Sequence, residues 1–137
     1  MDPVLQSFVS GAPVLIGHFA ATLALLAGGV AVYMAITPHN ELKLIRAGNI
    51  PAAVSFAGMV IGLALPLAAS MAASFSFLEV IVWGVFALIG QIAVFFVVDR
   101  LFGDLSRRIE AGEMAPAVVL VGTKLAVAIV GAAALSG

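Results

Sequence analysis

Four long apolar stretches alternate with short polar segments along the chain. A helix rises 1.5 Å per residue, so about 20 apolar residues cross the roughly 30 Å hydrocarbon core of a bilayer. The stretches run from about Ala12 to Ile36, Ile50 to Ala73, Phe77 to Val98, and Met114 to the C-terminus. The pattern predicts an all-α polytopic membrane protein with four transmembrane helices, and residues 1–137 form one integral membrane domain.

The two polar segments around residues 38–49 and 99–113 each have the pattern of a short amphipathic helix. In the first, Leu42 and Ile45 share one face. In the second, Leu105 and Ile109 do so. A glycine follows each segment, as is common where a helix ends. We therefore expect short interfacial helices lying along the membrane surface.

Basic residues concentrate in these same two segments. The N-terminal segment, the turn near residues 70–76 and the C-terminus contain no Lys or Arg. Short loops rich in Lys and Arg stay in the cytoplasm. We expect both polar loops to be cytoplasmic and both termini to lie outside. The residues that carry this inference are Lys43, Arg46, Arg100, Arg107 and Arg108.

The chain also resembles itself after a shift of 64 residues. Ile45, Ala47 and Gly48 then match Ile109, Ala111 and Gly112. This predicts two copies of one unit, about 12–73 and 77–137, each consisting of a span, a surface helix, a glycine and a span. Because each unit has two spans, the copies share an orientation and form a parallel repeat. Chance matching among Ala, Val and Gly is the alternative explanation.

Composition supports the membrane assignment and excludes several function classes. Hydrophobic residues make up 64% of the chain and charged residues 9%, against about 45–50% and 25% in soluble domains. There is no cysteine, which excludes disulfides and thiolate sites, and the net charge of −1 gives no indication of nucleic-acid binding. Asp2 is acidic and no basic residue precedes the first span, so we do not expect a signal peptide.

Small residues mark the helix faces that we expect to pack. Helices in lipid associate through close backbone approach, which small residues permit. The candidates are Gly28, Gly58, Gly62, Gly84 and Gly122, with a stripe in the first span formed by Gly17, Ala20, Ala24, Gly28, Ala31 and Ala35. Pro66 is expected to kink the second span and free a backbone carbonyl. A surplus small face would also serve a homo-oligomer, a dimer or larger.

Lys124 is the basic residue that lies within a span, about ten residues into the fourth, roughly 14 Å from its start. Charged residues at membrane depth are costly and usually face the bundle interior or a water-filled cavity. Lys124 therefore either lines such a cavity, or extends toward the cytoplasmic surface to meet Asp99. The sequence leaves both interpretations open.

Gln91 and His18 are the other candidate polar residues at depth. Gln91 lies on the small-residue face of the third span, where an interhelical hydrogen bond is its expected role. His18 has no second ligand at helical spacing, so it is weak support for a metal or proton relay. No catalytic constellation, metal motif or nucleotide loop is present. We expect no enzyme activity, no cofactor and no metal.

Several motifs resemble the YjfL-type family of bacterial inner-membrane proteins. The run Ile36 to Leu42 reads ITPHNEL, and Gly58, Ile61–Gly62 and Pro66–Leu67 form a G-x-x-I-G-x-x-x-P-L pattern. The resemblance covers essentially the whole chain, including Gly122–Thr123, and implies a small multi-pass protein of the bacterial plasma membrane with a domain of unknown function. It draws interest to the loop residues Thr37, Pro38, His39, Asn40 and Glu41. Lys124 is not part of this pattern.

Two main function hypotheses follow. The leading one is a non-enzymatic protein that acts as an oligomer, for ion or small-solute passage or for envelope-stress support. The alternative is a scaffold that recruits a cytoplasmic partner protein through the ITPHNE loop. A third possibility is an intramembrane enzyme or cofactor carrier that uses His18 and Lys124.

Overall fold

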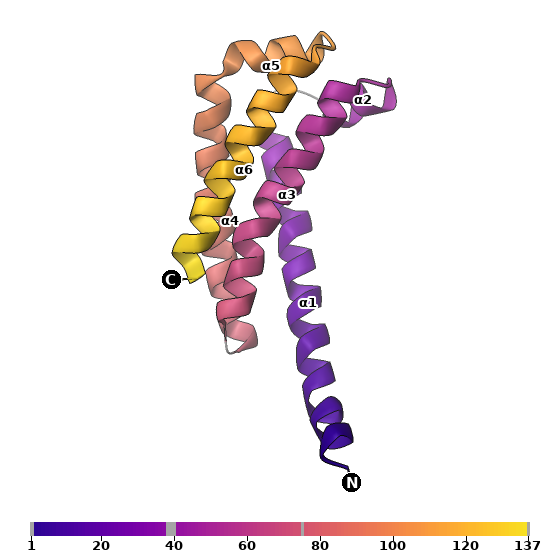
Figure 1. Ribbon diagram of the computed structural model, residues 1–137, viewed down its shortest axis with the longest axis vertical. Helices are drawn as coiled ribbons and strands as arrows, with labels where there is room; N and C mark the ends of the chain where they lie inside the picture. Colours follow the sequence, from indigo (N-terminus) through magenta and orange to yellow (C-terminus); the bar gives the residue numbers. More distant parts are fainter. Residues whose placement is uncertain (1, 38–40, 75, 137) are drawn as a thin grey trace.

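The computed structural model describes residues 2–37, 41–74 and 76–136, and within these ranges the chain forms six helices. Four of them are long and apolar enough to cross a membrane, which confirms the predicted all-α fold with four candidate spans. In Figure 1 the four long helices run lengthwise, and the two short ones lie at one end, called the loop end below. The helices are α1 (Pro3–Ile36), α2 (Glu41–Arg46), α3 (Ile50–Ala73), α4 (Phe77–Leu101), α5 (Gly103–Glu110) and α6 (Met114–Ser136).

Helix α1 begins at Pro3, well before the expected start near Ala12. The side chain of Asp2 accepts a hydrogen bond from the Val4 amide at 2.9 Å, and proline at the first helical position is already constrained to a helical φ. These caps start the helix before its apolar run. The N-terminal part of α1 consequently projects beyond the other helices (Figure 1).

Both short helices end in the same kind of turn. Gly48 and Gly112 have φ values of +87° and +92°, a left-handed conformation that favours glycine. The amide of Gly48 donates to the Ile45 carbonyl, and the amide of Gly112 donates to that of Ile109. The chain then turns and continues as the next long helix, α3 after Gly48 and α6 after Gly112.

Asn49 connects the two turns. Its side-chain oxygen accepts from the Ala52 amide at 3.0 Å and so caps α3. Its side-chain nitrogen donates to the carbonyls of Ile109 and Glu110, at 3.3 and 3.1 Å. The start of α3 is thereby tied to the end of α5.

Helix α3 is the centre of the bundle and contacts each of the other helices. Three expected packing glycines lie where side chains press on the backbone. A Cβ atom added at Gly58 would lie 2.7 Å from Val121, one at Gly62 would lie 2.5 Å from Phe95, and one at Gly84 would lie 2.6 Å from Leu25. Glycine at these positions lets α3 approach α6 and α4, and lets α4 approach α1.

Gly28 and Gly122 differ from this expectation, since an added Cβ would meet no atom within 4 Å at either position. On α1 the contact is made by Gly29, against Leu88. Tyr33 and Gly29 are buried on the same face, whereas Gly28 lies about 100° around the helix. Ala24, Ala31 and Ala35 of the small-residue stripe are likewise exposed.

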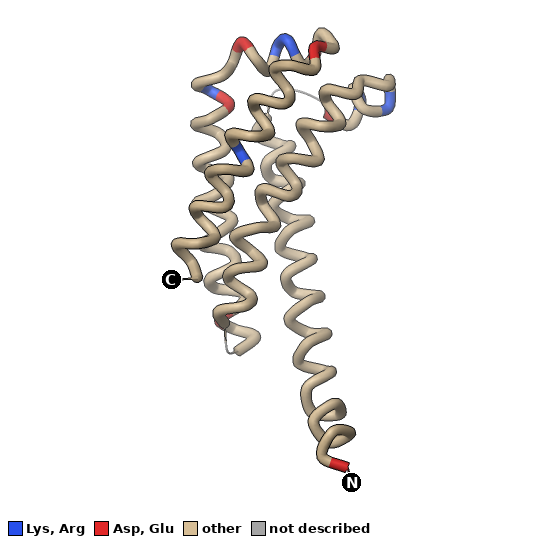
Figure 2. Tube along the Cα trace, viewed as in Figure 1, with Lys and Arg blue, Asp and Glu red and all other residues tan. Residues whose placement is uncertain are grey.

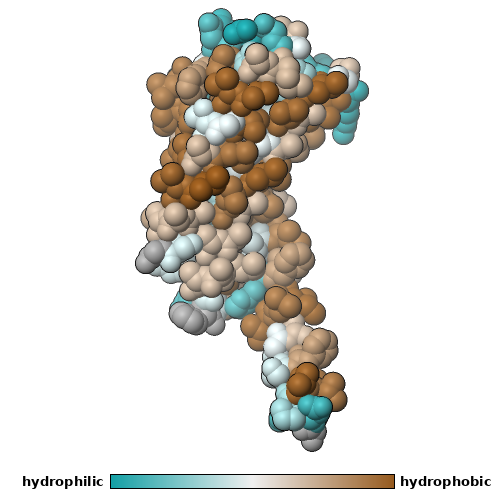
Figure 3. Space-filling model, viewed as in Figure 1, coloured by the Kyte–Doolittle hydropathy of each residue, from teal (hydrophilic) through white to brown (hydrophobic). Residues whose placement is uncertain are grey.

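Charge and apolar surface divide the molecule along its length. Figure 2 shows the Lys and Arg residues gathered at the loop end, with one base farther along α6, which is Lys124. Between this end and the N-terminus, the visible face carries mainly apolar side chains (Figure 3). A belt of this kind suits a lipid environment.

Candidate functional site at the loop end

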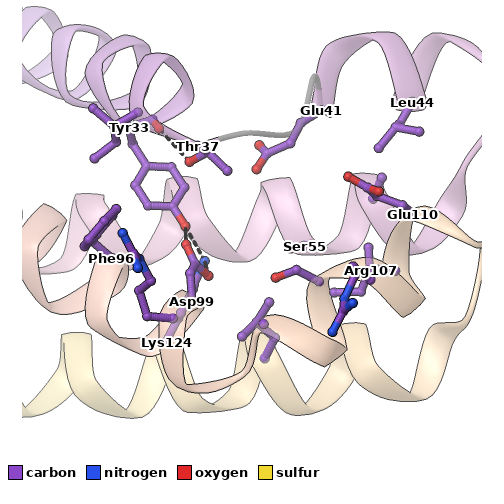
Figure 4. A pocket seen from close by; sticks show the side chains of 17 residues that line it. Tyr33, Thr37, Glu41, Leu44, Ser55, Phe96, Asp99, Arg107, Glu110 and Lys124 are labelled. Carbon is purple, nitrogen blue, oxygen red and sulfur yellow. Dashed lines mark hydrogen bonds and ion pairs between the residues drawn. The ribbon is translucent and has the colours of Figure 1, made fainter.

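Tyr33, Asp99 and Lys124 form a cluster inside the bundle, called the Lys124 cluster below. The Lys124 ammonium lies 2.8 Å from Asp99 Oδ1 and donates to the Tyr33 hydroxyl at 2.6 Å. The same hydroxyl donates to Asp99 Oδ2. Three residues from three different helices therefore share one closed set of polar contacts (Figure 4).

The Lys124 ammonium of the cluster is shielded from the outside by aromatic rings. Lys124 is 3% exposed and Tyr33 is 1% exposed. The Lys124 ammonium lies 4.9 Å from the centre of the Tyr33 ring and 5.4 Å from that of Phe95. A cation over aromatic faces gains electrostatic stabilisation, more so when it is removed from water. The ammonium is thus held by one carboxylate, one hydroxyl and two rings.

The positions along the helices explain how these side chains meet. Tyr33 lies three residues before the end of α1, and Asp99 lies two residues before the end of α4. The side chain of Lys124 bridges from deeper in α6 to that level. The Lys124 side chain lies in the bundle interior and also extends toward the loop end, where it meets Asp99. It thus combines features of the two interpretations that the sequence left open. Its small neighbours Ala117 and Ala128 are fully buried and let α6 pack closely at this face.

A pocket of about 470 Å³ opens beside the cluster, called the loop-side pocket below. All six helices contribute to it, and the short helices α2 and α5 supply its rim. Figure 4 shows Thr37 beside Tyr33, and Ser55 between Asp99 of the cluster and Arg107 of α5. Its walls also include the apolar side chains of Ile36, Leu44, Ala52, Phe96, Ile109 and Leu120.

Glu41 is the last residue of the ITPHNE motif, and its side chain lines this pocket. Burial raises the pKa of the Glu41 carboxyl, the Lys124 charge lowers it, and the Asp99 charge raises it. Thr37 lies at the opposite end of the motif, where its hydroxyl donates to the Tyr33 carbonyl at 2.6 Å. Thr37 and Glu41 both line the pocket. Pro38, His39 and Asn40 lie outside the described residues.

Gln91 lies in a separate, closed part of the bundle and is 5% exposed. Its side-chain nitrogen lies 3.4 Å from the Gly62 carbonyl, to which it donates. Pro66, four residues after Gly62, has no N–H to pair with that carbonyl. Gln91 thus supplies the donor that the proline removes.

His18 is half-buried on α1, and its ring centre lies 6.4 Å from that of Phe77. It is not among the pocket residues. Within the described ranges, no three His, Asp or Glu residues gather closely enough to hold a metal ion. The structure therefore brings Lys124 and part of the loop motif together, and leaves Gln91 and His18 elsewhere.

The sequence reasoning missed Tyr33 and Ser55 as site residues. Tyr33 is the single tyrosine of the chain and lies, like Asp99, about one turn from the loop end of a span. That shared depth was a usable signal. The rotation that turns both side chains toward Lys124 was not readable, because small residues occupy several faces of these helices.

Comparison with known proteins agrees with this architecture. The family model described as Domain of Unknown Function (DUF350) matches residues 7–135. The UPF0719 inner membrane protein YjfL of Escherichia coli strain K12 is 33% identical over 92 residues, which cover 67% of this chain and 70% of YjfL. The protein of the same name from E. coli O157:H7 matches equally well.

No solved structure matches the chain. A multi-pass protein of the inner membrane is what both the four apolar helices and these relatives support. The family model covers nearly the entire chain and the relatives are YjfL proteins, so the protein is a YjfL-like member of the DUF350 family.

Proposed function

We propose that this protein is a non-enzymatic, oligomeric membrane protein that admits a small solute or ion through the loop-side pocket. The observation that carries the proposal is the Lys124 cluster at the inner wall of that pocket. Ionisable residues within membrane spans that face a cavity are typical of solute and ion pathways. Beside the cluster, the pocket offers the Glu41 carboxyl and the Ser55 hydroxyl to an entering ligand.

The oligomer is part of the proposal because the single bundle is closed beyond the cluster. Tyr33, Met59, Leu63, Leu67 and Phe95 form a tightly buried apolar core there. Passage across the full membrane accordingly runs between copies of the chain. The exposed small residues Gly28 and Gly122 offer faces for close approach between copies.

We further infer that the loop end faces the cytoplasm and that both termini lie outside. Support comes from the basic residues of α2 and α5 and the positive-inside tendency of short loops. Helix α5 fits an interfacial position, since Ile109 is buried while Asp104 and Arg107 are exposed. The matched turns at Gly48 and Gly112, 64 residues apart, support a parallel repeat of two units.

Flux into liposomes tests the function. Purified protein is reconstituted, and potassium and proton flux are measured for wild type and for Lys124→Met. We expect wild-type flux above that of empty liposomes and a reduction of about tenfold in the variant, equivalent to about 1.4 kcal/mol. Background flux in the wild type would end the proposal.

Two control variants make the result specific. Lys43→Met is the same substitution on α2 at a position that does not line the pocket, and it should leave flux unchanged. The double variant Lys124→Met/Asp99→Leu removes both charges and so avoids an unpaired buried carboxylate. It should be stable and still poorly active; full flux in the double variant would argue against a role of the cluster in passage.

A further inference from the structure

The loop-side pocket contains a carboxylate oxygen without a donor. Glu41 Oε2 is buried and has no hydrogen-bond partner among the described residues. A buried acceptor without a donor is costly, and more so when it is charged. Native proteins rarely leave such a group unmatched unless a proton, an ion or a ligand completes it.

Each basic side chain that lines the pocket has a contact of its own. The Lys124 ammonium lies on Asp99 and Tyr33. The Arg107 guanidinium lies 2.5 Å from Asp104, and that of Arg100 lies over the Phe96 ring at 5.0 Å. Over the whole lining, the carboxyl groups of Glu41, Asp99 and Glu110 are matched in number by the basic groups of Lys124, Arg100 and Arg107. Among these carboxyl groups, that of Glu41 has a buried oxygen without a donor.

The walls of the pocket select among the donors that could complete the Glu41 carboxylate. Leu44, Ile109 and Leu120 contribute aliphatic surface, and Phe96 contributes a ring. A volume of about 470 Å³ is within the range of small-molecule sites. Hard metal cations prefer several oxygen ligands and retained water. An ammonium group attached to a short hydrocarbon satisfies both the carboxylate and the apolar wall.

We propose that the loop-side pocket binds a small amphipathic ammonium ion, whose N–H groups donate to Glu41 and whose hydrocarbon part lies against the apolar wall. A primary ammonium has three donors, and Figure 4 shows the Ser55 hydroxyl within the same pocket as Glu41. This inference rests on the proposed function, since it names the class of solute that enters.

Calorimetric titration of the full chain in nanodiscs tests it, with empty nanodiscs subtracted. The probes are n-butylammonium, n-butanol and butyrate, which share a hydrocarbon chain and differ in charge. We expect saturable binding of butylammonium and no binding of butyrate or butanol at the same concentrations. Absence of butylammonium binding, or equal binding of butanol, would overturn the inference.

Three variants locate the site. Glu41→Gln keeps the shape and removes the charge, and it should weaken butylammonium binding by at least about tenfold. Glu113→Gln is the matched control, because Glu113 is exposed and does not line the pocket. Ser55→Leu fills the pocket without changing charge and should also abolish binding. Unchanged affinity in Glu41→Gln would assign the ligand to another place.

The outcome is separable from that of the flux experiment. Butylammonium binding at Glu41 together with background potassium and proton flux would support this site and contradict passage. Flux that depends on Lys124 in a protein that binds no butylammonium would support passage and overturn this inference.

Discussion

Two buried polar contacts hold the long helices together, and they differ in charge and in access to open space. Gln91 donates to the Gly62 carbonyl in the closed middle of the bundle. The Lys124 cluster is charged and borders the loop-side pocket. The first contact supplies the Gly62 carbonyl with the donor that Pro66 lacks. The second gathers more polar groups than packing requires.

The contrast shows how a polar residue at membrane depth can be assigned. When a neutral side chain pairs with a backbone group that lacks its helical partner, the needs of the fold explain its presence. The fold alone does not explain an ion pair that faces a cavity, because a hydrophobic pair of similar size would be at least as stable. Variants of each contact can be compared directly by unfolding in mixed micelles.

The largest effect is expected from breaking the ion pair on one side only. Lys124→Met leaves the Asp99 carboxylate without its cation, and should lower the free energy of unfolding by about 3 kcal/mol. We choose the lower end of the range for such substitutions because the Asp99 side chain is 21% exposed. Lys124→Met/Asp99→Leu should recover most of this loss; a double variant as unstable as the single one would show that charge pairing is not the cause.

Removing the Tyr33 hydroxyl is expected to have the next largest effect. Tyr33→Phe eliminates the contacts to Lys124 and Asp99 but leaves their direct ion pair. Hydrogen bonds to charged groups contribute about 1.5–3 kcal/mol, and a loss in that range should appear in the free energy of unfolding. Thr123→Val is the control, because its hydroxyl donates to the local Val119 carbonyl within its own helix. Equal stability of the two variants would contradict a bridging role for Tyr33.

Gln91→Leu is expected to cost less, about 0.6 kcal/mol, the average for interhelical hydrogen bonds in membranes. The contact should also depend on the proline. In a Pro66→Ala background the new backbone amide at this position can pair with the Gly62 carbonyl, so Gln91→Leu should then cost almost nothing. A double-mutant cycle measures this coupling, and strict additivity would refute the assigned role of Gln91.

The exposed ion pair of Arg108 and Glu113 provides the smallest effect. Hydrogen bonding to Arg108 lowers the pKa of the Glu113 carboxyl. The folded state therefore binds this proton more weakly than the unfolded state does. The ion pair stabilises the fold above the unfolded pKa of Glu, about 4.3, and this stabilisation is lost as pH falls through the folded pKa. Carboxyl resonances followed by NMR should show a higher Glu113 pKa in Arg108→Gln; an unchanged midpoint would mean the pair does not form in solution.

Much of the fold was predictable because it depends on length and hydropathy. The ends of the spans at Ile36, Ile50, Ala73, Phe77 and Met114 fell where expected. The start of α1 was missed since capping by Asp2 and Pro3 extended the helix ahead of its apolar run. A short local interaction outweighed the pattern there.

The site was only partly predictable for a different reason. Depth follows from counting residues, so Lys124 and its partner Asp99 could be anticipated. Helix rotation does not follow, and it decided that Gly29 rather than Gly28 contacts Leu88 and that Tyr33 faces inward. Glu41 was placed in the motif but not in the pocket, because a six-residue helix is too short to reveal its inner face by periodicity.

The location of the Lys124 cluster has a consequence for biosynthesis. A chain emerges from the ribosome with its N-terminus first, so Tyr33 and Asp99 precede Lys124 into the membrane. The lysine, which is costly to insert at this depth, arrives when its carboxylate and hydroxyl partners are already available. Helices α3 and α4, which follow one another in the chain, similarly bring Gln91 to the open Gly62 carbonyl. Along the chain, the partners Tyr33 and Asp99 thus precede the residue, Lys124, that needs them in the membrane.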